Sequence, residues 1–139
     1  MRLAALALLA ASCGGAAVGP VGVSDKHQDI AVLWAQIRDW SRDAKIQLDP
    51  GSQVIAYVRG KTVSEERAVC PAHHDVPPVC NDSCNLSDAI CDNAEQICKI
   101  ADELGKDDDY AQGKCDSAKA SCREGKQECC KCSDQGTQP

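Results

Sequence analysis

The spacing of the cysteines constrains this chain more than any other feature. Cysteines seven positions apart lie on nearly one face of an α-helix. Six of the eleven cysteines form two such rows: Cys84, Cys91 and Cys98, then Cys115, Cys122 and Cys129. Each cysteine of the first row can be paired with one of the second so that the two residue numbers have a constant sum, as in two antiparallel helices. The sequence therefore predicts three disulfides between the helices: Cys84–Cys129, Cys91–Cys122 and Cys98–Cys115.

The residues between these cysteines support the pairing, because all of them are small. They also pair at a constant sum: Ser87 with Gly125, Ala94 with Ala118, and Ala101 with Ala111. A disulfide needs Cα atoms within about 7 Å, which is closer than helices packed through leucine layers usually come. Small residues between the disulfides are what this geometry requires.

Four further cysteines flank or follow the rows. Extending the series of small residues outward pairs Cys80 with Cys132, and elimination then leaves Cys70 for Cys130. Cys129, Cys130 and Cys132 lie close enough in sequence to exchange partners. The spacing therefore leaves the pairing of Cys70, Cys80, Cys130 and Cys132 open.

An amphipathic helix precedes the hairpin. Apolar residues recur every three or four positions, a pattern typical of such a helix, at Ile30, Leu33, Trp34, Ile37, Trp40 and Ala44. Asp49-Pro50-Gly51 should stop this helix, because proline disfavours helical geometry in the residue before it. We therefore expect an all-α fold, in which a helix over about 25–48 packs on a disulfide-laced antiparallel hairpin of about 82–104 and 109–131.

The apolar strip around Ile90 and Ile97 places the first hairpin helix at the centre. The N-terminal helix should cover that strip, and the second hairpin helix should be solvated on its remaining faces. We expect an extended segment at 54–58, one helical turn at 64–68, and an irregular connector at 71–79. With so few large apolar side chains, disulfides replace much of the core.

The N-terminus resembles a lipoprotein signal. Met1-Arg2 gives a positive start, 3–10 an apolar run, and Ala11-Ser12-Cys13 a small-residue cleavage site ending in cysteine. We therefore expect a signal peptide at 1–12, lipidation of Cys13, and a tether over 13–23. One small helical domain follows at 24–132, divided into 24–79 with the N-terminal helix and connector and 80–132 with the cysteine hairpin. A flexible tail completes the chain at 133–139.

Cysteine parity supports the same compartment. Loss of Cys13 from the eleven leaves an even number, which can pair completely in an oxidising envelope. Gly14 lacks the aspartate that retains some lipoproteins in the inner membrane, which favours the outer membrane. The net charge of −6 and the low aromatic content argue against a nucleic-acid partner.

No residue set in the chain predicts a reaction, so we expect neither an enzyme nor a cofactor. Cys70, His73 and His74 could hold copper or zinc, but a bridged sulfur is a poor metal ligand. A metal-handling or thiol-redox lipoprotein using these residues and Cys130 is the alternative. A protease inhibitor presenting the connector over 71–79 is a third hypothesis.

The hairpin also resembles a known family. The segment from Cys84 to Leu104, Lys114-Cys115, the run from Ala118 to Arg123, and Cys129-Cys130-x-Cys132 are similar to cysteine-rich lipoproteins, chiefly myxobacterial, to which no activity is assigned. The resemblance implies an exported, lipid-anchored protein and supports no catalytic role. Our leading hypothesis is therefore a lipid-anchored structural or protein-binding module. Its unknown protein or envelope partner should contact Trp34 and Trp40.

Overall fold

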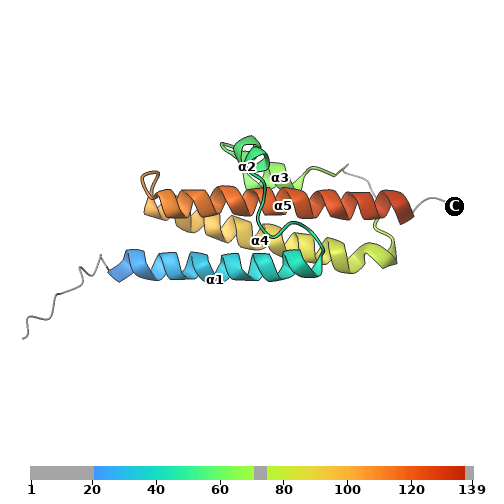
Figure 1. Ribbon diagram of the computed structural model, residues 1–139, viewed down its shortest axis with the longest axis horizontal. Coiled ribbons are helices and arrows are strands. Elements are labelled where there is room, and N and C mark those ends of the chain that lie inside the picture. The colour runs from blue at the N-terminus through green and yellow to red at the C-terminus, as the bar shows by residue number, and fades with distance from the viewer. Residues whose placement is uncertain (1–20, 71–74, 137–139) are drawn as a thin grey trace, which may run out of the picture.

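The computed structural model describes residues 21–70 and 75–136, and within these residues the chain is helical and contains no strand (Figure 1). The elements are α1 (Val21–Asp43), α2 (Ser52–Val58), α3 (Val63–Arg67), the 3₁₀ turn η1 (Pro78–Cys80), α4 (Asn81–Leu104) and α5 (Asp109–Gly136). The expected all-α fold is confirmed. Three long helices run side by side, and α2 and α3 lie across them on the side away from α1 (Figure 1).

α4 and α5 form the expected antiparallel hairpin. Gly105 ends α4 with a φ of 98°, a conformation that side chains rarely adopt. Asp108 caps α5 by accepting a 3.0 Å hydrogen bond from the backbone N–H of Ala111. The side chain of Gln112 closes the tip, because it donates to the carbonyl oxygens of Ala101 and Gly105.

α1 begins at the hairpin tip and runs antiparallel to α4 (Figure 1). Lys26 Nζ lies 2.9 Å from Glu103 Oε2, and His27 Nε2 lies 2.7 Å from Asp108 Oδ2. The Ala111 N–H and then His27 hold the pKa of Asp108 below its usual range. These contacts fix the start of α1 to the tip.

The core is thin, as expected from the composition. It consists of Ile30, Trp34 and Ile37 from α1, Ile90, Ala94, Ile97 and Ala101 from α4, Ala111 and Ala118 from α5, Ile46, Val63, and the sulfur-bearing side chains of Cys91, Cys115 and Cys122. α4 contacts both α1 and α5. Its central position, expected from the strip around Ile90, is what the structure shows.

α1 ends earlier than the proline at position 50 predicts. The helix stops at Asp43, and Lys45 takes a left-handed φ of 59°. Ile46 N–H then donates to Ser41 O at 2.9 Å and Lys45 N–H to Arg42 O at 3.1 Å, the bonding pattern of a Schellman cap. The turn buries Ile46 in the core, and that burial stabilises a conformation usually left to glycine.

The expected tether and tail also differ from the structure at their inner ends. Residues 21–23 belong to α1 and residues 133–136 to α5. Ser133 is buried and its hydroxyl donates to Cys129 O, so the first part of the expected tail continues α5. The expected signal peptide, the remainder of the tether and residues 137–139 lie outside the described part of the chain.

Two expectations for the middle of the chain were wrong. Residues 54–58 are not extended but lie in α2, where a helix satisfies its own backbone hydrogen bonds and needs no partner strand. α5 is also not solvated on all its outer faces: α2 and α3 pack on it, and Lys119, Ala120 and Ser121 are buried. The turn expected at 64–68 is confirmed as α3 at Val63–Arg67.

Over the residues that the structure describes, every helix is too short or too polar to cross a lipid bilayer.

Candidate functional site

Of the two expected partner contacts, Trp34 is buried in the bundle and Trp40 lies at its edge. Trp34 is only 8% exposed, and Trp40 is half-buried against the same core. Lys114 Nζ lies 4.8 Å from the centre of the Trp34 ring. Most of the apolar stripe of α1 is thus covered by packing on the hairpin, and Trp34 offers little surface to a partner.

The ten cysteines of the described residues all form disulfides. The pairs are Cys70–Cys130, Cys80–Cys132, Cys84–Cys129, Cys91–Cys122 and Cys98–Cys115, which are the five that the spacing, its extension and elimination indicate. The Cα atoms of the two inner pairs, at Cys91 and Cys98, are 4.6 Å from those of their partners. Five disulfides in a chain this small indicate an oxidising extracellular or envelope environment.

Only two of the four residues of the alternative metal or redox site, Cys70 and Cys130, lie in the described part of the chain. Cys70 and Cys130 are bonded to each other, so neither offers a free thiolate to a metal ion or a substrate. His73 and His74 lie outside the described residues. Within residues 21–70 and 75–136, no three His, Cys, Asp or Glu side chains cluster so that they could hold a metal ion.

A charged cluster that the sequence did not indicate joins α2 and α3 to α5. Tyr57 on α2 is half-exposed, with Lys61 Nζ 3.4 Å and Arg123 Cζ 4.4 Å from its ring centre. A hydrogen bond from Lys61, and then the positive charges of Lys61 and Arg123, lower the pKa of Tyr57 from its usual value.

Glu66 lies at the base of this cluster. Its side chain is 1% exposed, and Oε2 accepts a 3.0 Å hydrogen bond from Arg123 while Oε1 lies 3.8 Å from Lys61 Nζ. A buried carboxylate is tolerated when cations pair with it. The ion pair therefore fixes α3 on α5, and a capping box between Thr62 and Glu65 starts the helix.

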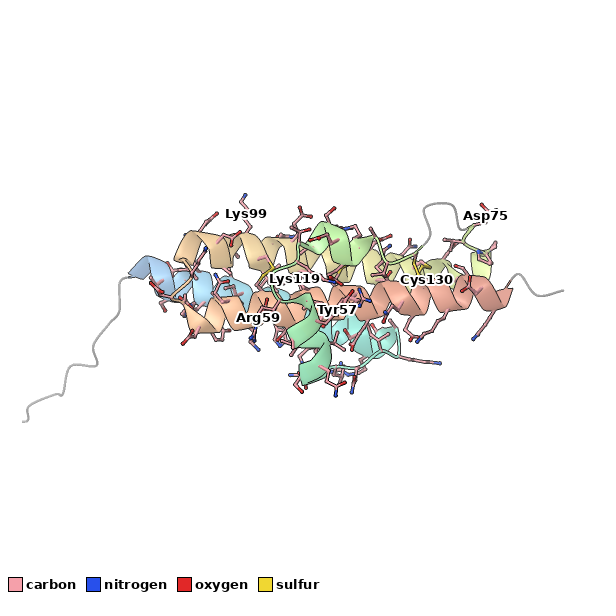
Figure 2. All side chains as sticks on the ribbon, turned by 90° about the horizontal axis from the view of Figure 1, so that it is seen from above. Tyr57, Arg59, Asp75, Lys99, Lys119 and Cys130 are labelled. Carbon is pink, nitrogen blue, oxygen red and sulfur yellow. A yellow bond between two sulfur atoms is a disulfide. The ribbon has the colours of Figure 1, made fainter. Side chains whose placement is uncertain are left out.

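Asp116 and Lys119 extend the cluster along α5. Lys119 Nζ lies 2.8 Å from Asp116 Oδ1 and donates to the carbonyl oxygen of Lys61 at 3.1 Å. Arg59 reaches the other oxygen of Asp116 at 3.4 Å. Figure 2 shows Tyr57, Arg59 and Lys119 near the middle of the bundle, where α2 meets α5.

A groove of about 950 Å³ runs from this cluster toward the hairpin tip. Cys98 and Cys115, which form a disulfide, and Gly113 are among the residues that line it, and a Cβ added to Gly113 would meet no atom within 4 Å. Its charged lining is mixed and comprises Arg59, Lys61, Lys99, Lys106, Lys119, Glu95, Asp102, Asp109 and Asp116. Such a lining could contact a polar or charged molecule. The lining residues include no histidine that could act as a base near neutral pH.

The sequence indicates one part of the charged cluster, its two cations on α5. Lys119 and Arg123 lie four positions apart on one face of α5. The sequence does not show that Tyr57, Lys61 and Glu66 come to that face, because the connector that carries them has no periodicity of its own.

Cys13, the expected lipidation site, lies outside the described residues. No protein-family model, no curated protein and no solved structure matches the chain.

Proposed function

We propose that this chain is an exported lipoprotein, anchored through Cys13, that serves as a rigid structural or protein-binding module of the cell envelope. The observation that carries the proposal is the pairing of cysteines. All ten cysteines outside the N-terminal region are used in disulfides, so Cys13 alone is left, directly after an apolar run of the kind that precedes a lipidation site.

The second support is the way in which the fold resists unfolding. Each disulfide stabilises the fold by about 3 kcal/mol because it lowers the entropy of the unfolded chain. The total is smaller than the sum of five such contributions, because the loops are nested. With a thin core held by such bonds, the module would persist in an environment containing proteases. This property suits a scaffold, and the resemblance of the hairpin to cysteine-rich lipoproteins points in the same direction.

The anchor can be tested by fatty-acid labelling of a bacterial host that expresses the full chain. We expect label on the wild type and none on Cys13→Ser, with a Ser12→Ala variant as the matched control that keeps its label. A mature protein whose N-terminal peptide begins elsewhere, or carries no lipid mass, would contradict the proposal.

The same preparation separates the scaffold from the redox and metal alternative. We expect alkylation of the unreduced mature protein to modify none of the ten cysteines from Cys70 to Cys132, because the scaffold uses each of their sulfurs in a disulfide. A modified Cys70 or Cys130, or copper or zinc that co-purifies in equimolar amount, would favour the alternative. This measurement does not depend on the anchor, so either part of the proposal can fail by itself.

A further inference from the structure

The end of the bundle opposite the tip carries a short turn at residues 75–79, the last two of which belong to η1, the element before α4. Two disulfides fix its surroundings: Cys80, which ends the turn, is bonded to Cys132, and Cys70 before it is bonded to Cys130. Cys130 and Cys132 both lie in the last turns of α5. The chain is thus attached to one helix end on both sides of the turn.

The turn exposes apolar side chains that the small core leaves uncovered. Val79 is 81% exposed, the highest value among the large apolar residues that the structure describes, and Val76 is 37% exposed. The two valines do not lie in a loose chain end, because the backbone around them is constrained. Cys80 N–H donates to Pro77 O at 2.8 Å, and two successive prolines limit the backbone.

Rigidity matters because binding is weakened by every torsion that must be ordered. A turn with two prolines, a backbone hydrogen bond and a disulfide at its end has little freedom left to lose. An exposed valine on such a turn can therefore enter a pocket at a small entropic cost. The same valine on a free loop would contribute less.

The turn also lies far from the membrane anchor at Cys13. This part of the inference rests on the proposed function, because the anchor is part of that proposal. Cys13 lies eight positions before Val21, which limits the lipid to within about 28 Å of the start of α1. α1 starts at the tip, and the 28 residues of α5 extend over about 42 Å to the other end. Figure 2 shows Asp75 at that far end.

Charges beside the turn indicate what kind of surface it fits. Asp75 precedes Val76, and Asp82 follows Val79 by three residues in the first turn of α4. Both are exposed, and neither forms an ion pair with any residue that the structure describes. The chain as a whole has a net charge of −6. Complementary charge would steer and orient a basic surface toward this end.

We propose that the turn at residues 75–79 docks, through Val79 and Val76, into an apolar pocket of an envelope protein whose rim carries lysine or arginine. The acidic flanks oppose contact with an anionic lipid surface. The Cys80–Cys132 disulfide fixes the end of the turn in the docking conformation, and the Cys70–Cys130 disulfide limits how far the chain before it can move from α5.

Site-specific photocrosslinking in the living host tests the location of the contact. A photoreactive amino acid is placed at position 79 or, as the matched control, at position 32, where Val32 is also exposed but lies on α1. We expect a crosslinked protein from position 79 and not from position 32, in the lipid-anchored form and also in exported Cys13→Ser protein. Absence of a product at position 79, equal products at both positions, or a product containing only a second copy of this chain would overturn the proposal.

Binding measurements with the partner protein, identified by crosslinking and then purified by itself, test which side chains of the turn contribute to the affinity. We expect Val79→Ser to weaken binding about tenfold or more, Val32→Ser to leave it unchanged, and Asp75→Asn with Asp82→Asn to weaken it and reduce its dependence on salt. Replacing Cys70 and Cys130 together by serine should weaken binding while the other four disulfides, checked by peptide mapping, remain. Equal affinity of Val79→Ser and wild type would overturn the proposal. A chain with Cys13 intact that crosslinks at position 79 but carries no lipid would refute only the anchor.

Discussion

Gly125 lies so close to Ser87 that a Cβ added to the glycine would be 3.1 Å from the serine Cβ. The two residues face each other between the Cys84–Cys129 and Cys91–Cys122 disulfides. The disulfides bring the backbones of α4 and α5 together, and the residues between them must be small for this reason.

Two glycines of α5 should therefore respond in opposite ways to substitution. Gly125→Val should destabilise the protein by about 1–3 kcal/mol, because the added atoms collide with α4. Gly113→Ala should stabilise it by about 0.5–1 kcal/mol, since alanine is the better helix former and a Cβ at position 113 meets nothing within 4 Å. Guanidinium unfolding with the disulfides intact measures both changes. A destabilised Gly113→Ala would contradict the open space around position 113.

The burial of Trp34 gives a second prediction. Trp34→Ala should lower the free energy of unfolding by about 3–5 kcal/mol, because it removes a large side chain from a core that contains few others. Val32→Ala, two positions away on the exposed face of α1, should change it by less than about 0.5 kcal/mol. Chemical unfolding with tryptophan fluorescence from Trp40 is a suitable measurement. A small effect of Trp34→Ala would mean that α1 does not pack as described.

The cysteine positions explain why the hairpin could be predicted from the sequence and the end of α1 could not. The sulfur rows fix both partner and direction, so Cys91 and Cys122 are enough to indicate the hairpin and its register. The end of α1 was missed because its C-terminal cap uses Lys45 in a left-handed conformation, where the usual signal would be glycine. Burial of Ile46 by the hairpin, a tertiary contact, stabilises that turn.

The candidate site was predicted less well for a similar reason. The apolar stripe with Trp34 was recognised, but nothing local shows how much of that stripe the hairpin covers. The cluster around Tyr57 and Glu66 depends on where a connector without periodicity comes to lie on α5. Such a placement follows from tertiary packing and from the Cys70–Cys130 bond, and it cannot be derived from the periodicity of one helix.

Glu66 should stabilise the position of α3. Glu66→Ala should lower the free energy of unfolding by about 2 kcal/mol, because it leaves two half-buried cations without their carboxylate. Asp92→Ala, which removes the exposed partner of Arg67, should cost less than about 1 kcal/mol. Hydrogen exchange should show faster exchange in α3 only for the first variant. Equal exchange in both variants would rule out the buried pair as the link between α3 and α5.

Glu124 gives a prediction about pH. Burial, and then the charge of Glu128, raise the pKa of Glu124, and its Oε2 has no hydrogen-bond partner among the residues described. A carboxyl with a raised pKa in the folded state weakens the fold as pH rises through that value and adds no penalty below its usual pKa. Glu124→Gln should therefore raise the melting temperature at neutral pH and lose this advantage below about pH 4.5. An advantage that is unchanged by pH would contradict the assignment.

The central claim is that five disulfides, three of them crossing between α4 and α5, hold this domain together. Peptide mapping of the unreduced mature protein, with mass measurement of each linked pair, tests it most directly. We expect the pairs Cys70–Cys130, Cys80–Cys132, Cys84–Cys129, Cys91–Cys122 and Cys98–Cys115, and no free thiol among these ten cysteines. Free sulfurs at Cys91 and Cys122, or bonds between cysteines of the same helix, would contradict it.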